Sequence, residues 1–290
     1  MGEEFIIAGV QMEPIILDKK GNLAKCLELI ELTAKKNARL IVFPECALTG
    51  YMFSSLDEAE PECEYIRGPS TKKIIEACRD LNVYVVIGLL EKEKDIDKYK
   101  YYNTAVLIGP KGRIIGKHRK LHLPCLGIDR FLNDGNRPPR VYDTKYDTKT
   151  EVGRIGMGIC YDMMFAEYSR VLALKEADIL IFPSNWPKTG RVYTDYIVPT
   201  RAIENHVFCV AVNRVGKERG TTFFGGSVIA HFDLDKKVVL AKGKTREDDI
   251  IYATIEPTKA RRKHLVIAKE HEVDFIKDRR PQFYDKICQV

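Results

Sequence analysis

Short apolar runs recur along the chain, and most of them are bounded by Gly, Pro, Asp or Asn. Their content of β-branched and aromatic residues is typical of β-strands. Between several runs, apolar residues recur at spacings of three and four and predict helices over 22–37, 71–82 and 166–177. The predicted strands cover residues 5–12, 38–45, 82–91, 101–110, 153–160, 177–184, 206–214, 225–232 and 249–256.

Two helix–strand units occur twice in the same order. Residues 38–45 (ARLIVFPE) resemble 177–184 (ADILIFPS), and a helix followed by 82–88 (NVYVVIG) parallels 201–212 (RAIENHVFCVAV). Strands that are apolar almost throughout are buried on both faces. We therefore predict an α/β protein with two mixed β-sheets packed face to face and helices outside, a four-layer αββα sandwich. No Pro/Gly/Ser-rich linker divides the halves, so residues 1–290 are predicted to form a single domain.

The composition narrows the expected classes of binding partner and the expected cellular compartment. Hydrophobic residues make up 45% and charged residues 30% of the 290 residues, and the net charge of +6 is spread along the chain. This pattern is not typical of nucleic-acid binding, and neither a membrane span nor a secretory signal is predicted. The eight Cys are scattered, without a CxxC pair or metal-ligand spacing. We expect no disulfides, no metal and a cytoplasmic location.

Two charged residues lie at the ends of strand-like stretches. Glu45 directly follows RLIVFP, where poor solvation would raise the pKa of a carboxyl group and suit it to act as a general base. A capping or salt-bridged Glu is an equally good interpretation. Lys120 ends the basic stretch 114–120, which is otherwise typical of an edge strand. One lysine turned into a site would stabilise an oxyanion.

Cys160 lies at the end of the predicted strand 153–160, after two glycines and before Tyr-Asp. A nucleophile at such a strand-to-helix turn has backbone N–H groups beside it that can bind an oxyanion. The alternative is a buried structural Cys, which is the commonest role of this residue. The other seven Cys lack the glycine-bearing strand exit, and the six His show no distinctive context for a Cys–His pair.

The ordered motifs FPE (43–45), TGY (49–51), KHRKLHLP (117–124) and GICYD (158–162) resemble the carbon–nitrogen hydrolases of the nitrilase superfamily. SNWP (184–187), RAIEN (201–205), NRVG (213–216) and GGS (225–227) support the resemblance, which covers nearly the whole chain.

This resemblance implies the αββα sandwich and a catalytic triad of Glu45, Lys120 and Cys160. It implies a thioester on Cys160, with Glu45 as acid and base, and Lys120 and the backbone N–H of Tyr161 around the oxyanion. Lys120 and a helix after Cys160 are expected to lower the pKa of the thiol. No metal or cofactor is implied.

Many members of the family carry a second Glu between the Lys and the Cys. No Glu occurs from 121 to 150 in this chain, and Asp129 is the nearest acidic candidate. A loop Asp paired with Arg130 is an equally good interpretation of this residue. The candidate oxyanion or substrate-binding residues are Tyr161, Tyr51, Asn185 and Trp186.

The residues after the Cys help to separate the branches of the family. CYD resembles amidases rather than true nitrilases, whereas Met164 and Ala166 depart from the CYDxRFPE pattern of ω-amidases. We predict hydrolysis of a small linear amide, with an N-carbamoyl amide hydrolase and then a nitrilase as alternatives. A binding scaffold without activity is the hypothesis from another class. The pocket is predicted to be lined by Tyr51, Met52, Leu126, Phe131, Met163, Trp186 and Tyr193.

The segment 257–290 is charged and carries interspersed aromatic residues, such as Phe283 and Tyr284. It is predicted to be a C-terminal oligomerisation extension of the hydrolase domain, in a homodimer or larger homo-oligomer.

Overall fold

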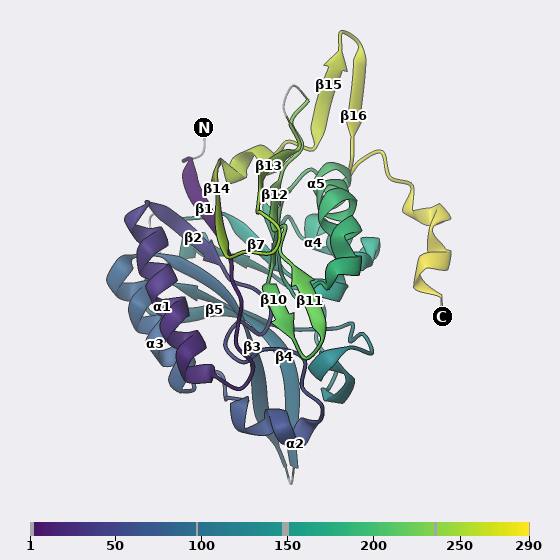
Figure 1. Ribbon diagram of the computed structural model, residues 1–290. Helices are drawn as coiled ribbons and strands as arrows, with labels where there is room; N and C mark the ends of the chain where they lie inside the picture. Colours follow the sequence, from purple (N-terminus) through teal and green to yellow (C-terminus); the bar gives the residue numbers. More distant parts are fainter. Residues whose placement is uncertain (1–2, 97, 147–150, 235–236, 290) are drawn as a thin grey trace.

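The computed structural model describes residues 3–96, 98–146, 151–234 and 237–289, which form two mixed sheets with helices outside them (Figure 1). The first sheet has the order β14 (Asp249–Ile255), β1 (Phe5–Gln11), β2 (Ala38–Val42), β3 (Tyr84–Asp95), β4 (Lys98–Gly109) and β5 (Arg113–Arg119). The second has the order β13 (Val239–Lys242), β12 (Val228–Ala230), β9 (Phe208–Asn213), β8 (Ile179–Ser184), β7 (Arg154–Met157) and β6 (Val141–Asp143). All nine predicted strands are present.

The two sheets share one pattern of strand directions. In the first, β1, β2 and β3 are parallel, and β4, β5 and β14 run antiparallel to their neighbours. In the second, β7, β8 and β9 are parallel, and β12, β13 and β6 run antiparallel to theirs. The predicted duplication is therefore confirmed.

Helices cover the outer face of each sheet, as predicted. The helices are α1 (Lys19–Lys35) and α3 (Pro69–Leu81) on the first sheet, α4 (Ala166–Leu174) and α5 (Val198–Asn205) on the second, and the short α2 (Leu56–Ala59). No helix in the described part of the chain is both long and apolar enough to cross a membrane.

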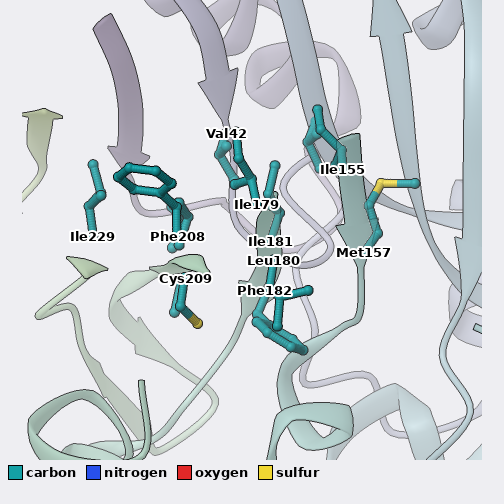
Figure 2. Packing of buried hydrophobic residues seen from close by; sticks show 14 of the residues in the cluster. Val42, Ile155, Met157, Ile179, Leu180, Ile181, Phe182, Phe208, Cys209 and Ile229 are labelled. Carbon is teal, nitrogen blue, oxygen red and sulfur yellow. The ribbon is translucent and has the colours of Figure 1, made fainter. Parts of the chain in front are cut away.

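Alternation along the strands divides the core into layers. Ile7, Leu40 and Val42 pack with residues of the second sheet, whereas Ala8 and Ile41 pack in a separate cluster with α1 and α3. Successive side chains of a strand point to opposite faces, so each central strand is buried on both sides. Figure 2 shows part of the first of these clusters, with Val42 of the first sheet among residues of the second sheet. This cluster continues through the second sheet to α4 and α5. This confirms the four-layer αββα sandwich.

Two small hairpins complete the fold. One is formed by β10 (Val215–Glu218) and β11 (Thr221–Phe224), and the other by β15 (His264–Ala268) and β16 (His271–Asp274). The second hairpin projects from the body in Figure 1, and the chain then runs alongside α4 to its C-terminus. The second hairpin and the segment that follows it make up most of the predicted extension 257–290. The part of this extension in oligomerisation stays a prediction. All eight Cys are free thiols.

Candidate active site

The three residues of the predicted triad all follow the ends of strands. Glu45 comes three residues after β2, Lys120 directly follows β5, and Cys160 begins the 3₁₀ helix η4 (Cys160–Met164) after β7. Two of these strands belong to the first sheet and one to the second, so face-to-face packing brings the three exits together. All three side chains are buried.

Lys120 joins two carboxylates. Its Nζ donates to Glu45 Oε1 at 2.6 Å and to Asp129 Oδ2 at 2.5 Å, and all three side chains are fully buried. The neighbouring carboxylates outweigh burial and raise the pKa of Lys120 well above its ordinary value. Lys120 is therefore a fixed cation with one N–H left over from its two ion pairs. The preceding residue, Arg119, pairs with Glu91 and Glu93 instead, as the strand alternation predicts.

Glu45 is poised to exchange a proton. Burial raises the pKa of its carboxyl group, and Asp129 adds to this effect, whereas Lys120 opposes it. Oε1 accepts from Lys120 and from Asn103 Nδ2 at 2.7 Å, but the buried Oε2 has no hydrogen-bond partner among the described residues. A buried polar atom without a partner costs about 1–3 kcal/mol. Oε2 is thus the atom of the carboxylate that is able to bind another group.

Asp129 belongs to this cluster and not to Arg130. Besides Lys120, it accepts from the Tyr51 hydroxyl at 2.8 Å and from Asn103 Nδ2 at 2.9 Å. Arg130 donates to the carbonyl of Gly127 instead. The sequence left two interpretations of Asp129 open, an auxiliary acid or a loop Asp paired with Arg130. The structure places Asp129 beside Lys120. Its three donors hold it in one position, and it holds Lys120 in turn.

Cys160 occupies a turn that few residues with a side chain adopt. Its φ of +46° lies in the left-handed region, and such conformations cluster at functional sites. Its sulfur accepts a hydrogen bond from the backbone N–H of Asn185, which lowers the pKa of the thiol, as does the charge of Lys120. Burial and the charge of Glu45 outweigh both, so the pKa of Cys160 lies well above its ordinary value.

The expectation of a low thiol pKa was therefore wrong. The element after Cys160 is a five-residue 3₁₀ turn, which supplies less dipole than an α-helix. The thiol is protonated at rest, so it can act as a nucleophile only if a base takes its proton.

Asp162 links the turn of Cys160 to the end of β5, and sequence reasoning missed it. Its Oδ2 accepts from the N–H of Ile159 at 2.9 Å and lies 2.9 Å from His118 Nε2. Its Oδ1 lies 2.7 Å from His122 Nδ1 and accepts from the N–H of Leu121. These partners overcome burial and lower the pKa of Asp162. The two His thus have a distinctive role, contrary to the expectation from sequence. The HRKLH spacing around Lys120 was the available signal.

Asn103 was also missed. It lies within β4 and donates to both Glu45 and Asp129, and its Oδ1 lies 3.8 Å from the sulfur of Cys46. A lone Asn inside an apolar strand, where polar residues are unfavourable, was the signal for it.

The loop that carries Tyr51 is anchored from the second half of the chain. Glu218 accepts from the backbone N–H of Tyr51 and of Met52, at 2.8 and 2.5 Å. The fully buried Arg214 donates to Glu218 at 2.6 Å. This pair fixes the position from which the Tyr51 hydroxyl reaches Asp129.

The remaining candidates differ in their place. Asn185 and Trp186 are buried directly after β8, and neither the side-chain amide of Asn185 nor the indole N–H of Trp186 has a partner in the described chain. The Tyr161 side chain is 38% exposed and packs edge-on against Phe165, away from the buried cluster. Of the predicted pocket residues, Met52, Leu126 and Phe131 pack against the buried cluster that contains Tyr51. Met163 and Trp186 belong to the large cluster around the second sheet, and Tyr193 packs against it.

Known proteins resemble this chain over nearly its whole length. The family model for carbon-nitrogen hydrolases matches residues 6–264. A nitrilase of Pyrococcus abyssi is 36% identical over 279 residues, covering 96% of this chain and 98% of the relative. An omega-amidase of Bos taurus is 29% identical over 261 residues, covering 87% and 88%.

The solved structure of a carbon-nitrogen hydrolase from Helicobacter pylori G27 shares the fold, with a TM-score of 0.82, 23% identity and 99% of each chain covered. The family model and the relatives extend over the strands and the strand exits that build the site. The chain belongs to the carbon-nitrogen hydrolases of the nitrilase superfamily.

Proposed function

We propose that this hydrolase cleaves a small linear amide to a carboxylic acid and ammonia, with Cys160 as nucleophile, Glu45 as general acid and base, and Lys120 as the oxyanion-stabilising cation. The observation that carries the proposal is the buried Lys120, held between Glu45 and Asp129 beside the left-handed turn of Cys160. A structural thiol needs neither a fixed cation nor a carboxylate with an unpaired oxygen beside it.

The first half-reaction forms a thioester. Glu45 takes the thiol proton as the sulfur of Cys160 attacks the amide carbon, and the carbonyl oxygen becomes an oxyanion. The remaining N–H of Lys120 and the backbone N–H of Tyr161 stabilise this charge. Glu45 then gives its proton to the amide nitrogen, the C–N bond breaks, and ammonia leaves. The raised pKa of Glu45 suits both transfers.

The second half-reaction releases the acid. Glu45, again ionised, takes a proton from a water molecule that attacks the thioester carbon. The C–S bond breaks, the sulfur recovers its proton from Glu45, and the carboxylic acid departs. Asp129 positions Lys120 through both steps, in place of the second Glu of the family. The eight free thiols suit a reducing compartment, so we place the activity in the cytoplasm.

Nitrile hydrolysis is the second candidate, because the relative that is 36% identical is named a nitrilase. The same thiol attack on a nitrile carbon gives a thioimidate, which two waters convert to acid and ammonia. Release of ammonia together with carbon dioxide from an N-carbamoyl amide would follow the amide route, with a carbamic acid as the product of the second step.

The test is ammonia release from primary amides, N-carbamoyl amino acids and nitriles by the wild type and by Cys160→Ala. We expect release from at least one linear amide and a loss of about 10⁴-fold or more in the variant. Cys209→Ala is the matched control, since Cys209 is an equally buried thiol on β9 of the same sheet. Equal activity of Cys160→Ala and Cys209→Ala would disprove the nucleophile. A wild type that releases ammonia from none of the compounds would favour the scaffold hypothesis.

A further inference from the structure

The side-chain amide of Asn185 is an exception among the buried polar groups of this protein. The residue is 2% exposed, and neither the nitrogen nor the oxygen of its amide has a hydrogen-bond partner in the described chain. Buried polar groups in folded proteins are nearly always paired. An Asn amide offers two donors and two acceptor positions. Its burial without a partner therefore indicates a role other than holding the fold together.

Asn213 shows what a structural Asn looks like at the neighbouring strand end. It is also fully buried, on β9 beside β8, but both the nitrogen and the oxygen of its amide are hydrogen-bonded. Its Oδ1 accepts from the N–H of Trp186 at 2.7 Å, and its Nδ2 donates to the carbonyls of Trp186 and Gly225. The two residues match in type, burial and location, and they differ in whether the protein satisfies them.

Asn185 also lies at the reacting atom. Its own backbone N–H bonds to the sulfur of Cys160, which places the residue beside the thiol. The amide that reacts does not need it, because Lys120 retains an N–H for the carbonyl oxygen and Glu45 Oε2 is free to accept from the amide nitrogen. Asn185 is thus available to a different part of the same substrate.

The charges around the site indicate what kind of group this is. Lys120 is already shared by two carboxylates. The buried Arg201, which binds the chain just after the Cys160 turn, donates to the carbonyls of Met163 and Met164 and to Glu204. A carboxylate on the substrate would therefore enter a buried site whose nearby cations are already paired, which is costly. An uncharged group with both donors and acceptors suits an Asn amide.

We propose that Asn185 binds a second carboxamide on the acyl part of the substrate, so that the preferred substrates are uncharged diamides. This inference rests on the proposed function for the position of the reacting amide. The indole N–H of Trp186, which is also buried and unpaired, supplies one further donor next to Asn185 in the chain.

The test uses sets of three compounds that differ only at the far end. Malonamide, succinamide and glutaramide are each compared with the amide that has an isopropyl group, and with the monoamide that has a carboxylate, in place of the second carboxamide. We expect one diamide to exceed both of its analogues in kcat/KM by about tenfold or more in the wild type. Asn185→Leu should reduce this ratio to near one, mainly through the KM of the diamide.

Calorimetry measures the binding of the same compounds to Cys160→Ala. This measurement separates the inference from the proposed function. A wild type without hydrolytic activity would defeat the proposed function, whereas the subsite would still be judged by the binding preference. Equal or weaker binding of all three diamides relative to their isopropyl analogues would overturn the subsite. A preference for the carboxylates would overturn it too.

Thermal unfolding distinguishes a binding role from a structural one, because replacing a structural Asn would lower the Tm. Asn185→Leu removes an unpaired buried amide, so we expect its Tm to rise by about 2 °C. Asn213→Leu breaks three hydrogen bonds and should lower the Tm by several times as much. A Tm of Asn185→Leu that falls as far as that of Asn213→Leu would assign Asn185 to the fold and contradict the proposal.

Discussion

The two halves of this protein have one topology but different chemistry. Leu40 lies opposite Ile7 and Tyr84 in the first sheet, as Ile179 lies opposite Ile155 and Phe208 in the second. These equivalent pairs align the strands of the two halves, so residues at the same position along equivalent strands can be compared. Glu45 then corresponds to Ser184, and Met12 to Cys160.

In the mechanism that we propose, neither half contains a complete site. The first half supplies the carboxylate, the second supplies the thiol, and Lys120 and Asp129 come from the segment that connects them. The duplicated strands position the groups, and single substitutions at equivalent exits decide what each position does. The comparison therefore predicts that a substitution has a large effect on activity or stability at one member of each pair and a small effect at the other.

The largest contrast is expected between Glu45→Gln and Ser184→Ala. Glu45→Gln keeps an oxygen for Lys120 and Asn103 but cannot exchange a proton, so kcat/KM should fall by about 10³-fold. Ser184, whose hydroxyl bonds to the carbonyl of Phe182, has no part in the chemistry. Its Ala variant should stay within about threefold of the wild type. Steady-state assays on the best amide check both, and a similar loss in the two variants would argue against the assignment of Glu45.

A smaller effect is expected where Asp162 ties the second half to the end of β5. Asp162→Asn loses the charge that His118, His122 and three backbone N–H groups contact. We expect the free energy of unfolding to fall by about 2–3 kcal/mol and kcat/KM to fall by about tenfold. Urea unfolding and kinetics measure these changes.

Asp134→Asn is the control for this change, since Asp134 is exposed in the same connecting segment. Its variant should match the wild type in both measurements. An Asp162→Asn protein as stable and active as Asp134→Asn would show that the link to β5 does not position the site.

The last contrast concerns stability and not activity, at the residues that end α3 and α5. Asn82 and His206 correspond in the repeat, and both adopt the left-handed conformation after their helix. Burial, the nearby His231 and Lys263 lower the pKa of His206 to about 4. Because the unfolded chain binds this proton more readily, stability is complete above pH 6.5 and is lost as the pH falls towards 4.

His206→Asn places the cap of the first half in the second and removes this dependence. Between pH 7 and pH 4 the wild type should lose about 3 kcal/mol more than the variant. Urea unfolding at a series of pH values measures the difference. Parallel stability curves for the two proteins would show that His206 is not a source of acid sensitivity.

Much of the architecture followed from local sequence. Runs of β-branched residues, helical spacing and the repeated FP motif predicted the strands, the helices and the duplicated sheets, because these features depend on neighbouring residues. The same logic marked the strand exits at Glu45 and Cys160 as candidate positions, since the ends of parallel strands gather at one edge of a sheet, and the triad itself came from the resemblance to a family. The resemblance to a family then selected Lys120 among the basic residues around it.

Tertiary structure alone decided how these groups act on one another. Asn103 reaches across 58 positions to Glu45, and His118 reaches across 44 to Asp162, so a local pattern could mark these residues as unusual but could not reveal their partners. The raised pKa of Cys160 likewise depends on burial and on charges from other strands. The sequence determined which residues stand at the strand exits. Packing determined their distances, solvation and pairing, because these quantities belong to the assembled sheets and not to any one segment.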